Sequence, residues 1–272
     1  MCLKKGLSVA VISVLLNACG SSSSSSGGEN EGLLGIVVLT QFSEDLRPSG
    51  SPGAFGSGLF YRLDEIITSD TFAAGFNTDV DTCRAADDID NDVSGLPDLD
   101  NLLRDVNAGE TITFSDLAGT YATLQRTIDE DFSELGDATV YLSDSALTTP
   151  PQNLTVDISG GGDFPAFDNV FFPSVFITEI TPSVEQDINA DTTLRWIGNH
   201  REPFGRMFMT IDFDNGLNII CNALDDGSFS FPEDTRALIS ESSATFVSID
   251  RTAIRITSNG NATLLSVHSV HF

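Results

Sequence analysis

The stretch "RMFMTIDFDNGLNIICNAL", residues 206–224, most constrains what this chain can fold into. Large apolar side chains occupy every second position from Met207 to Phe213, which is the period of a strand with one buried face. Asn215-Gly216 follows, a pair that favours the positive φ angles of a tight turn, and a second apolar run returns. The sequence therefore predicts an antiparallel hairpin.

Strand signals also dominate the rest of the body. In "TTLRWIG", Trp196 shares a strand face with Leu194, which predicts a core position for the tryptophan. Short helices are predicted only at 97–106 and 232–240. Many short strands separated by Gly, Pro, Asn and Asp predict an all-β fold. Runs of β-branched and aromatic residues bounded by turn residues lie at 34–40, 111–114 and 138–142.

A change in composition divides the body. The stretch "SGGGDFPAFDNVFFPS", residues 159–174, is rich in Gly and Phe and predicts a junction. After it, "ITPS", "LRWIG" and the hairpin follow in the order of an immunoglobulin-like module. We therefore expect two tandem antiparallel β-sandwich modules, an N-terminal one over 33–174 and a C-terminal immunoglobulin-like one over 175–272.

The N-terminus has the layout of an export signal. Two lysines precede an apolar run over residues 6–16, and small residues stand before Cys19. This run is shorter than the roughly 20 residues that cross a bilayer. The tetrapeptide at 16–19, "LNAC", resembles the lipobox of bacterial lipoproteins, with Asn17 where a smaller residue is commoner. The resemblance implies that signal peptide 1–18 is removed and that Cys19 carries the lipid; the alternative is an ordinary secretory signal.

Residues 19–32 are predicted to form a disordered tether. They contain six consecutive serines and four glycines, the last of them Gly32, a composition that cannot bury apolar surface. Gly20 follows the cysteine where an aspartate would indicate retention in the inner membrane. The lipobox resemblance therefore implies a lipid-anchored protein of the bacterial cell envelope, in the outer membrane, and leaves open which face of that membrane it occupies.

The charge of the chain limits its partners. Lysine and arginine number 13 against 40 acidic residues, for a formal net charge of −27. Both lysines lie in the export signal, so its removal makes the charge more negative still. Nucleic acid and anionic lipid surfaces are bound through basic patches. We therefore expect no nucleic-acid partner, and an acidic surface suited to a saline exterior.

Several stretches resemble a pattern that recurs in uncharacterised exported proteins and lipoproteins of environmental bacteria. That pattern has a Gly-Gly-Asp stretch, a Trp-containing strand and a Cys…Asp-Gly-Ser-Phe…Pro strand across two β-sandwich halves, and an Asp-Ala-Gly turn in which Asn107 here replaces the aspartate. The resemblance implies the fold and carries no known activity. The matching stretches are "NAGETITF" (107–114), "GTYATL" (119–124), "GGGDFPAFDNVFFP" (160–173), "TLRWIG" (193–198) and "CNALDDGSFSFP" (221–232).

Two cysteines remain in the exported body once the signal is removed and Cys19 is lipidated. Cys83 and Cys221 are candidates for a disulfide, because exported proteins meet an oxidising environment. Such a bond would join the two halves. The alternatives are two separately buried thiols and a catalytic thiol, for which His200 would have to serve as the base.

The acid-rich segment "NTDVDTCRAADDIDNDVSG" contains the candidate metal site. Asp88, Asp90 and Asp92 have the alternating spacing of oxygen ligands around calcium. However, Val93 stands where the helix-loop-helix calcium motif needs glycine, and Leu99 where it needs glutamate. The choice is therefore between a looser calcium loop and a solvated acidic loop, and we favour the latter. No other cofactor is expected.

Two further sets of residues are interpreted as structural. Aspartates beside turns usually make local hydrogen bonds, and phenylalanines in a sandwich usually fill its core, although these could line a ligand groove. The aspartates are Asp212, Asp214, Asp225 and Asp226, and the phenylalanines are Phe164, Phe167, Phe171, Phe172 and Phe176.

Motifs of the common enzyme classes are missing from the sequence, with no nucleophile elbow, zinc-protease helix, phosphate loop or dinucleotide fingerprint. His268 and His271 are expected on opposite faces of one strand, which argues against a shared metal. The sequence thus favours a non-catalytic envelope lipoprotein that binds another protein, a polysaccharide or a cation. The alternative is an exported hydrolase, for example one acting on glycans, with a carboxylate pair that only the fold could reveal.

Overall fold

The structure, a computed structural model, describes residues 31–42, 53–63, 80–85, 106–128, 139–143, 147–175, 177–182, 188–198, 204–239 and 242–271. Its strands and its helix, in chain order, are β1 (Gly32–Phe42), β2 (Ala54–Leu63), β3 (Thr82–Ala85), β4 (Thr111–Asp116), β5 (Gly119–Ile128), β6 (Thr139–Ser143), β7 (Thr155–Ile158), β8 (Phe167–Phe171), β9 (Ile177–Thr181), β10 (Thr193–Gly198), β11 (Arg206–Phe213), β12 (Asn218–Leu224), β13 (Ser228–Ser230), α5 (Glu233–Ile239), β14 (Ala244–Asn259) and β15 (Ala262–His271).

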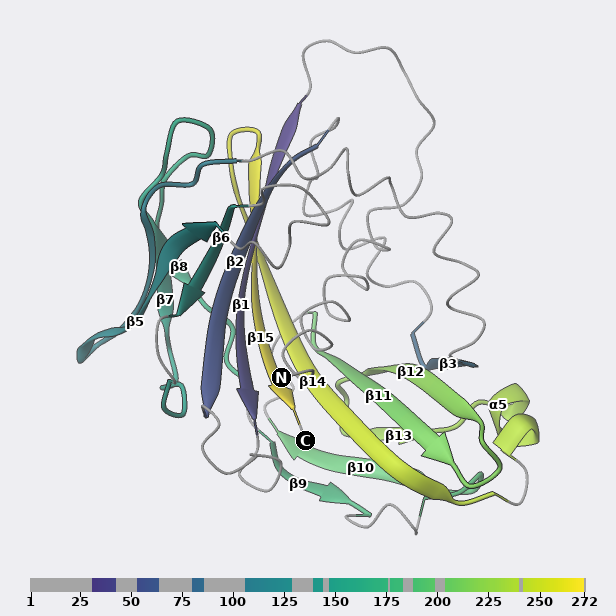
Figure 1. Ribbon diagram of the computed structural model, residues 1–272. Helices are drawn as coiled ribbons and strands as arrows, with labels where there is room; N and C mark the ends of the chain where they lie inside the picture. Colours follow the sequence, from purple (N-terminus) through teal and green to yellow (C-terminus); the bar gives the residue numbers. More distant parts are fainter. Residues whose placement is uncertain are drawn as a thin grey trace.

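The strands form one large sheet and one small sheet (Figure 1). The large sheet has 12 strands in the order β3-β12-β11-β14-β15-β1-β2-β6-β5-β4-β7-β8, and the small one has the order β13-β10-β9. Neighbouring strands are antiparallel except for β1 and β15, which pair in parallel from Leu33 opposite Ala262 to Phe42 opposite His271. The predicted all-β class is confirmed.

The centre of the large sheet is buried on both faces. Gly32–Leu39 of β1 and Ala262–Val270 of β15 are buried at every position. This explains why "LLGIVVL" in β1 is a continuous apolar run rather than an alternating one, as is usual for strands covered on both sides. One face contributes Val37 to the first core, and the opposite face contributes Leu34 to a smaller cluster.

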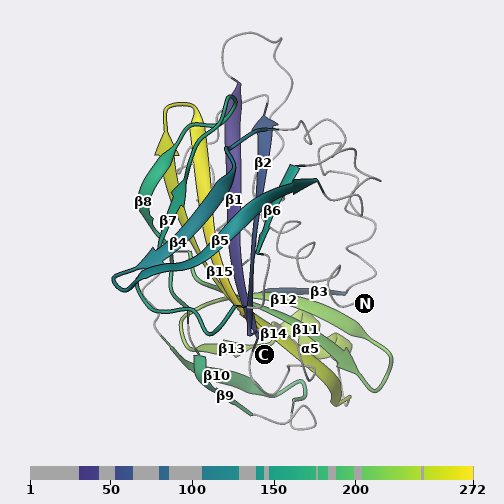
Figure 2. The same cartoon turned by 60° about the vertical axis from the view of Figure 1, so that its left-hand side comes forward.

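The first core lies inside a curl of the large sheet. Figure 2 shows β4 and β5 crossing in front of β1 and β15. The last strand, β8, returns to the side chains of β14: the guanidinium of Arg255 lies 4.4 Å from the ring centroid of Phe171. At the end of β14, Asn259 Nδ2 donates to the carbonyl of Ala166, the residue before β8, at 3.1 Å. Twisted sheets with many strands curl in this way and enclose one apolar face.

The second core lies between the other end of the large sheet and the small sheet. Inward residues of β11 and β12 face Leu194 and Trp196 of β10, and both of these are buried in that core as predicted. Ile239 of α5 closes the same core. The helix predicted at 232–240 is confirmed as α5, and Glu233 and Asp234 begin it, where acidic side chains favour the positive end of the helix dipole.

The predicted hairpin over 206–224 is confirmed as β11 and β12, with Met209 opposite Cys221. Its connection is longer than a two-residue turn, because residues 214–217 separate the two strands. Gly216 alone in this loop has a positive φ, of 85°, and its N–H donates to the carbonyl of Phe213 at 2.9 Å. A four-residue loop built in this way is a common hairpin connection.

The finer expectation of two tandem immunoglobulin-like modules is not confirmed. The two apolar cores draw mainly on the two predicted segments, but strands of both segments lie in the same 12-stranded sheet. The predicted division of the body at residue 175, into modules over 33–174 and 175–272, stays a prediction. The helix predicted at 97–106 lies outside the described residues except for Val106.

Candidate functional site

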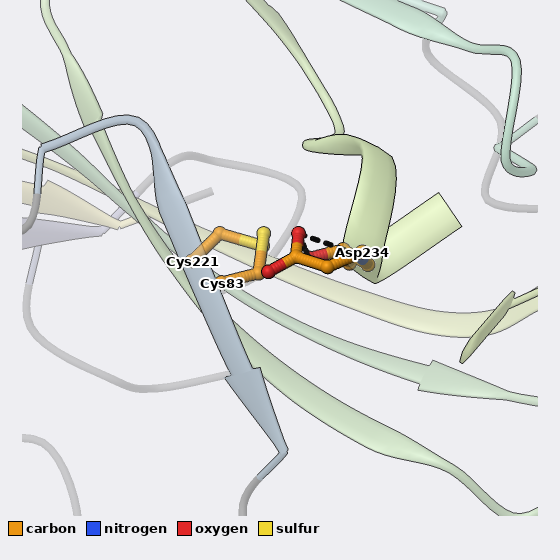
Figure 3. The surroundings of a disulfide bond; sticks show 4 residues. Cys83, Cys221 and Asp234 are labelled. Atoms are coloured by element: carbon orange, nitrogen blue, oxygen red, sulfur yellow. Dashed lines mark hydrogen bonds between the residues drawn. A yellow bond between two sulfur atoms is a disulfide. The ribbon is translucent and has the colours of Figure 1, made fainter. Parts of the chain in front are cut away.

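The structure joins β3 to β12 by a disulfide between Cys83 and Cys221, consistent with the predicted pairing (Figure 3). The two residues stand directly opposite each other in the antiparallel ladder, with their Cα atoms 4.0 Å apart. Residues that face each other without ladder hydrogen bonds have a similar spacing, about 4.5 Å. The bond thus attaches a strand from the N-terminal part of the chain to the edge of the C-terminal hairpin.

Asp234 of α5 points toward this disulfide (Figure 3). Its carboxylate accepts the N–H of Thr235 at 2.8 Å. Because both sulfur atoms are in the disulfide, neither is a free thiol, and His200, the base that a catalytic thiol would need, lies outside the described residues.

A buried cluster of charged and aromatic side chains links the two sheets. Asp225, in the turn after β12, accepts the indole N–H of Trp196 through Oδ1 at 2.7 Å and the Nε–H of Arg251 through Oδ2 at 2.7 Å. The side chains of Arg251 and Asp225 are only 1% and 7% exposed. Trp196 comes from the small sheet and Arg251 from the large one, so this carboxylate connects both layers.

A second buried arginine lies on the neighbouring strand. Arg206 of β11 donates from Nη1 to the carbonyl of Gly205 at 2.8 Å. Burial lowers the pKa of the Arg206 guanidinium, and the negative charge of Asp81 acts in the opposite direction. Asp81 also accepts the N–H of Leu224 through Oδ1 at 3.1 Å. Buried charges are tolerated when such partners are supplied.

Next to this cluster, the outer face of the small sheet is hollowed into a depression of about 390 Å³. We call it the β9–β10 depression. Two cross-strand pairs provide its exposed side chains, Arg195 with Thr181 and Ile197 with Glu179. Their alternation with buried neighbours places all four on the outer face. Trp196 and Gly227 complete the lining.

The floor of the depression is held by hydrogen bonds. The backbone N–H of Trp196 donates to the carbonyl of Gly227 at 3.1 Å, and its indole is fixed by Asp225. The turn between β12 and β13, which contains Gly227, is closed by Asp226, whose Oδ1 accepts the N–H of Ser228 at 3.2 Å. These bonds fix the backbone and the indole ring under the exposed side chains, so these groups lose little conformational freedom when a ligand binds.

The lining of the depression contains one acidic side chain. Glu179 is the single carboxylate of its lining, whereas glycoside hydrolysis uses two carboxyl groups about 5 to 10 Å apart. The carboxylate pair that the hydrolase alternative needs is therefore not found in this lining. The hydrolase alternative stays a prediction for the chain as a whole.

The structure does not test the predicted metal site. Asp88, Asp90 and Asp92 lie outside the described residues, as does Cys19. Among the residues that the structure describes, no three His, Cys, Asp or Glu side chains are grouped to hold a metal ion.

Two of the four turn aspartates, Asp212 and Asp226, make the local hydrogen bonds expected of them, whereas Asp214 bonds to a residue 29 positions along the chain. Asp212 accepts the side-chain amide of Asn218, Asp214 accepts the N–H of Ser243, and Asp226 closes its own turn. Asp225 is different, since its carboxylate is buried and paired with an arginine. Sequence reasoning missed this role, because aspartate before Asp-Gly is also typical of an ordinary exposed turn.

Three of the five phenylalanines fill the core, as favoured from the sequence. Phe164, Phe167 and Phe172 are buried in the first core. Phe171 is partly exposed and stacks on Arg255. Phe176 lies outside the described residues. These rings therefore contact one another and the core rather than lining the β9–β10 depression.

The two C-terminal histidines lie on β15 in different surroundings. His268 is 4% exposed, and its Nδ1 accepts the N–H of Val175 at 3.0 Å. Burial lowers the pKa of His268 to about 4, against a weaker opposing effect from the backbone of Pro173. His271 instead lies 2.7 Å from Asp250, measured from Nδ1 to Oδ1. The structure thus keeps the two rings apart, as expected.

No family model, curated protein or solved structure matches this chain. Within the described ranges, no helix combines the length and the apolar character needed to cross a bilayer.

Proposed function

We propose that this protein is a lipid-anchored component of the bacterial cell envelope whose β body binds an envelope protein or polysaccharide without catalysing a reaction. The lipid on Cys19 is its attachment to the outer membrane, and residues 19–32 are the tether. The body consists of two β-sandwich modules with a boundary near residue 175, which share the central strands.

The observation that carries this proposal is the disulfide between Cys83 and Cys221. Disulfides persist in oxidising compartments, outside the cytosol of most bacteria. The bond therefore supports export, which is also what residues 1–19 predict. One of the two cysteines, Cys221, is completely buried, which supports a structural role for the disulfide.

A binding role is supported by where the polar groups lie. The carboxylate of Asp225 is occupied by Arg251 and Trp196 in the interior. The accessible polar side chains of the β9–β10 depression sit on an open sheet face. Such a face suits recognition, whereas catalysis depends on groups held in a water-excluded site.

The anchor is tested by replacing Cys19 with serine in the full chain. We expect Cys19→Ser to abolish labelling by radioactive palmitate and to move the protein from the membrane to the soluble fraction. Cys2→Ser is the matched control, because that cysteine is removed with the signal. Membrane attachment that survives Cys19→Ser would refute the anchor.

The non-catalytic role is tested by assaying the purified wild-type protein against a panel of glycosides and esters. We expect no turnover of any of these substrates. Reproducible hydrolysis by the purified protein would refute the non-catalytic role and favour the alternative of an exported hydrolase.

A further inference from the structure

The β9–β10 depression brings a cation, a carboxylate, a hydroxyl and an exposed apolar side chain together on one sheet face. Arg195 provides hydrogen-bond donors, Glu179 provides acceptors, and the hydroxyl of Thr181 provides both. Ile197, which is 63% exposed, lies opposite Glu179 and two residues from Arg195 on β10. The lining therefore offers polar groups of both kinds around one apolar side chain.

The charges of this lining restrict the ligand. The positive charge of Arg195 and the negative charge of Glu179 cancel, so the depression is locally neutral. The whole chain is strongly negative, with a net charge of −27, which repels anionic polymers. A neutral ligand with both donors and acceptors fits these conditions better than a charged one.

Sugar hydroxyls have this property, because each donates one hydrogen bond and accepts others. The C–H groups of a sugar ring supply apolar surface that can cover Ile197. The volume of about 390 Å³ lies in the range of small-molecule sites, about 300–1,000 Å³.

An extended peptide is the main competitor. Peptides that augment a sheet bind along the backbone of an edge strand. The groups of the β9–β10 depression are instead side chains of two paired strands, Glu179 and Thr181 on one and Arg195 and Ile197 on the other, so the ligand lies across the face.

We infer that the β9–β10 depression binds a neutral glycan, with Arg195 and Glu179 bonding its hydroxyls and Ile197 contacting its C–H surface. This inference rests on the proposed binding function and names the ligand class for it. Trp196 acts as a positioning residue, since its indole is held by Asp225 beneath the lining.

The test is calorimetric titration of the full protein, extracted from membranes in detergent, with short neutral oligosaccharides built from glucose, mannose, galactose or xylose. We expect at least one to bind. Arg195→Ala and Glu179→Gln should each weaken it about tenfold or more, the effect of losing one hydrogen bond to a charged group. Arg236→Ala and Glu233→Gln, on the exposed surface of α5, are matched controls that should leave the affinity for the oligosaccharide unchanged.

The outcomes separate this inference from the proposed function. Absence of binding to every sugar of the panel, or equal affinity in Arg195→Ala, overturns the glycan inference. In that case crosslinking of the wild-type protein to an envelope protein would still support the proposed function. Consumption of the bound sugar during the titration would refute the non-catalytic function and keep the glycan site.

Discussion

Acidification should destabilise this protein through His268. The ring is buried against Phe172, and its Nδ1 accepts the N–H of Val175. Protonation would place a positive charge in an apolar core and convert Nδ1 from acceptor to donor. Burial accordingly lowers the pKa of His268 from 6.5 to about 4.

The direction and size of the effect follow from proton linkage. Between pH 6.5 and about 4 the unfolded chain binds the His268 proton and the folded protein does not, so the free energy of unfolding falls as the pH falls. The contribution is complete above pH 6.5 and is lost by about pH 4. At about 1.4 kcal/mol per pKa unit the total is about 3 kcal/mol, of which about 2 kcal/mol is lost between about pH 7.5 and about pH 5.

The assay is urea unfolding at these two pH values, followed by circular dichroism and by the fluorescence of Trp196. His268→Gln removes the titrating group, so its free energy of unfolding should fall with pH by about 2 kcal/mol less than that of the wild type. Val267→Ala, which removes no titratable group from the same strand, should keep the wild-type dependence. Identical pH profiles for the wild type and His268→Gln would refute the reasoning.

Two further substitutions test the packing, each by urea unfolding. Asp225→Asn removes the carboxylate charge that pairs with the buried guanidinium of Arg251 and should lower the free energy of unfolding by about 3–5 kcal/mol. Glu31→Gln, at an exposed ion pair, should change it by less than about 1 kcal/mol, and similar losses in both variants would contradict this difference. Gly161→Ala would place a Cβ 2.3 Å from a backbone oxygen and should lower the free energy of unfolding by about 1–3 kcal/mol. The control is Gly162→Ala, whose Cβ would meet no atom within 4 Å. Equal stability of the two variants would contradict the predicted clash and show that the loop adjusts freely.

Local structure was predictable wherever the sequence pattern itself sets the geometry. The hairpin of β11 and β12 follows from an alternating run and a Gly turn, and α5 follows from acidic residues at a helix start. The burial of Trp196 beside Leu194 follows from the same two-residue period. In each case the interacting residues are close in the sequence, so one pattern specifies both partners.

Long-range pairing was not predictable in this way. The continuous apolar run of β1 indicates burial on both faces, but it does not indicate that β15 is the parallel neighbour. The register between Leu33 and Ala262 depends on packing across the whole sheet. The cysteines were the one long-range signal, since disulfide chemistry restricted the partner of Cys83 to Cys221.

The burial of Asp225 was missed for a related reason. Its residue type and its place before a Gly turn match an exposed aspartate, and only the approach of Arg251 from β14 distinguishes it. The β9–β10 depression was not predictable for the same reason, because Glu179 and Arg195 come onto one face only when β9 pairs with β10.

The parallel pairing of β1 and β15 has a mechanical consequence. Because the strands run in the same direction, Gly32 and His271 lie at opposite ends of the ladder. A force that pulls these two residues apart loads its hydrogen bonds together in shear, and they must fail collectively rather than open one after another. A body tethered through β1 and pulled through β15 would therefore resist extension at the centre of its large sheet.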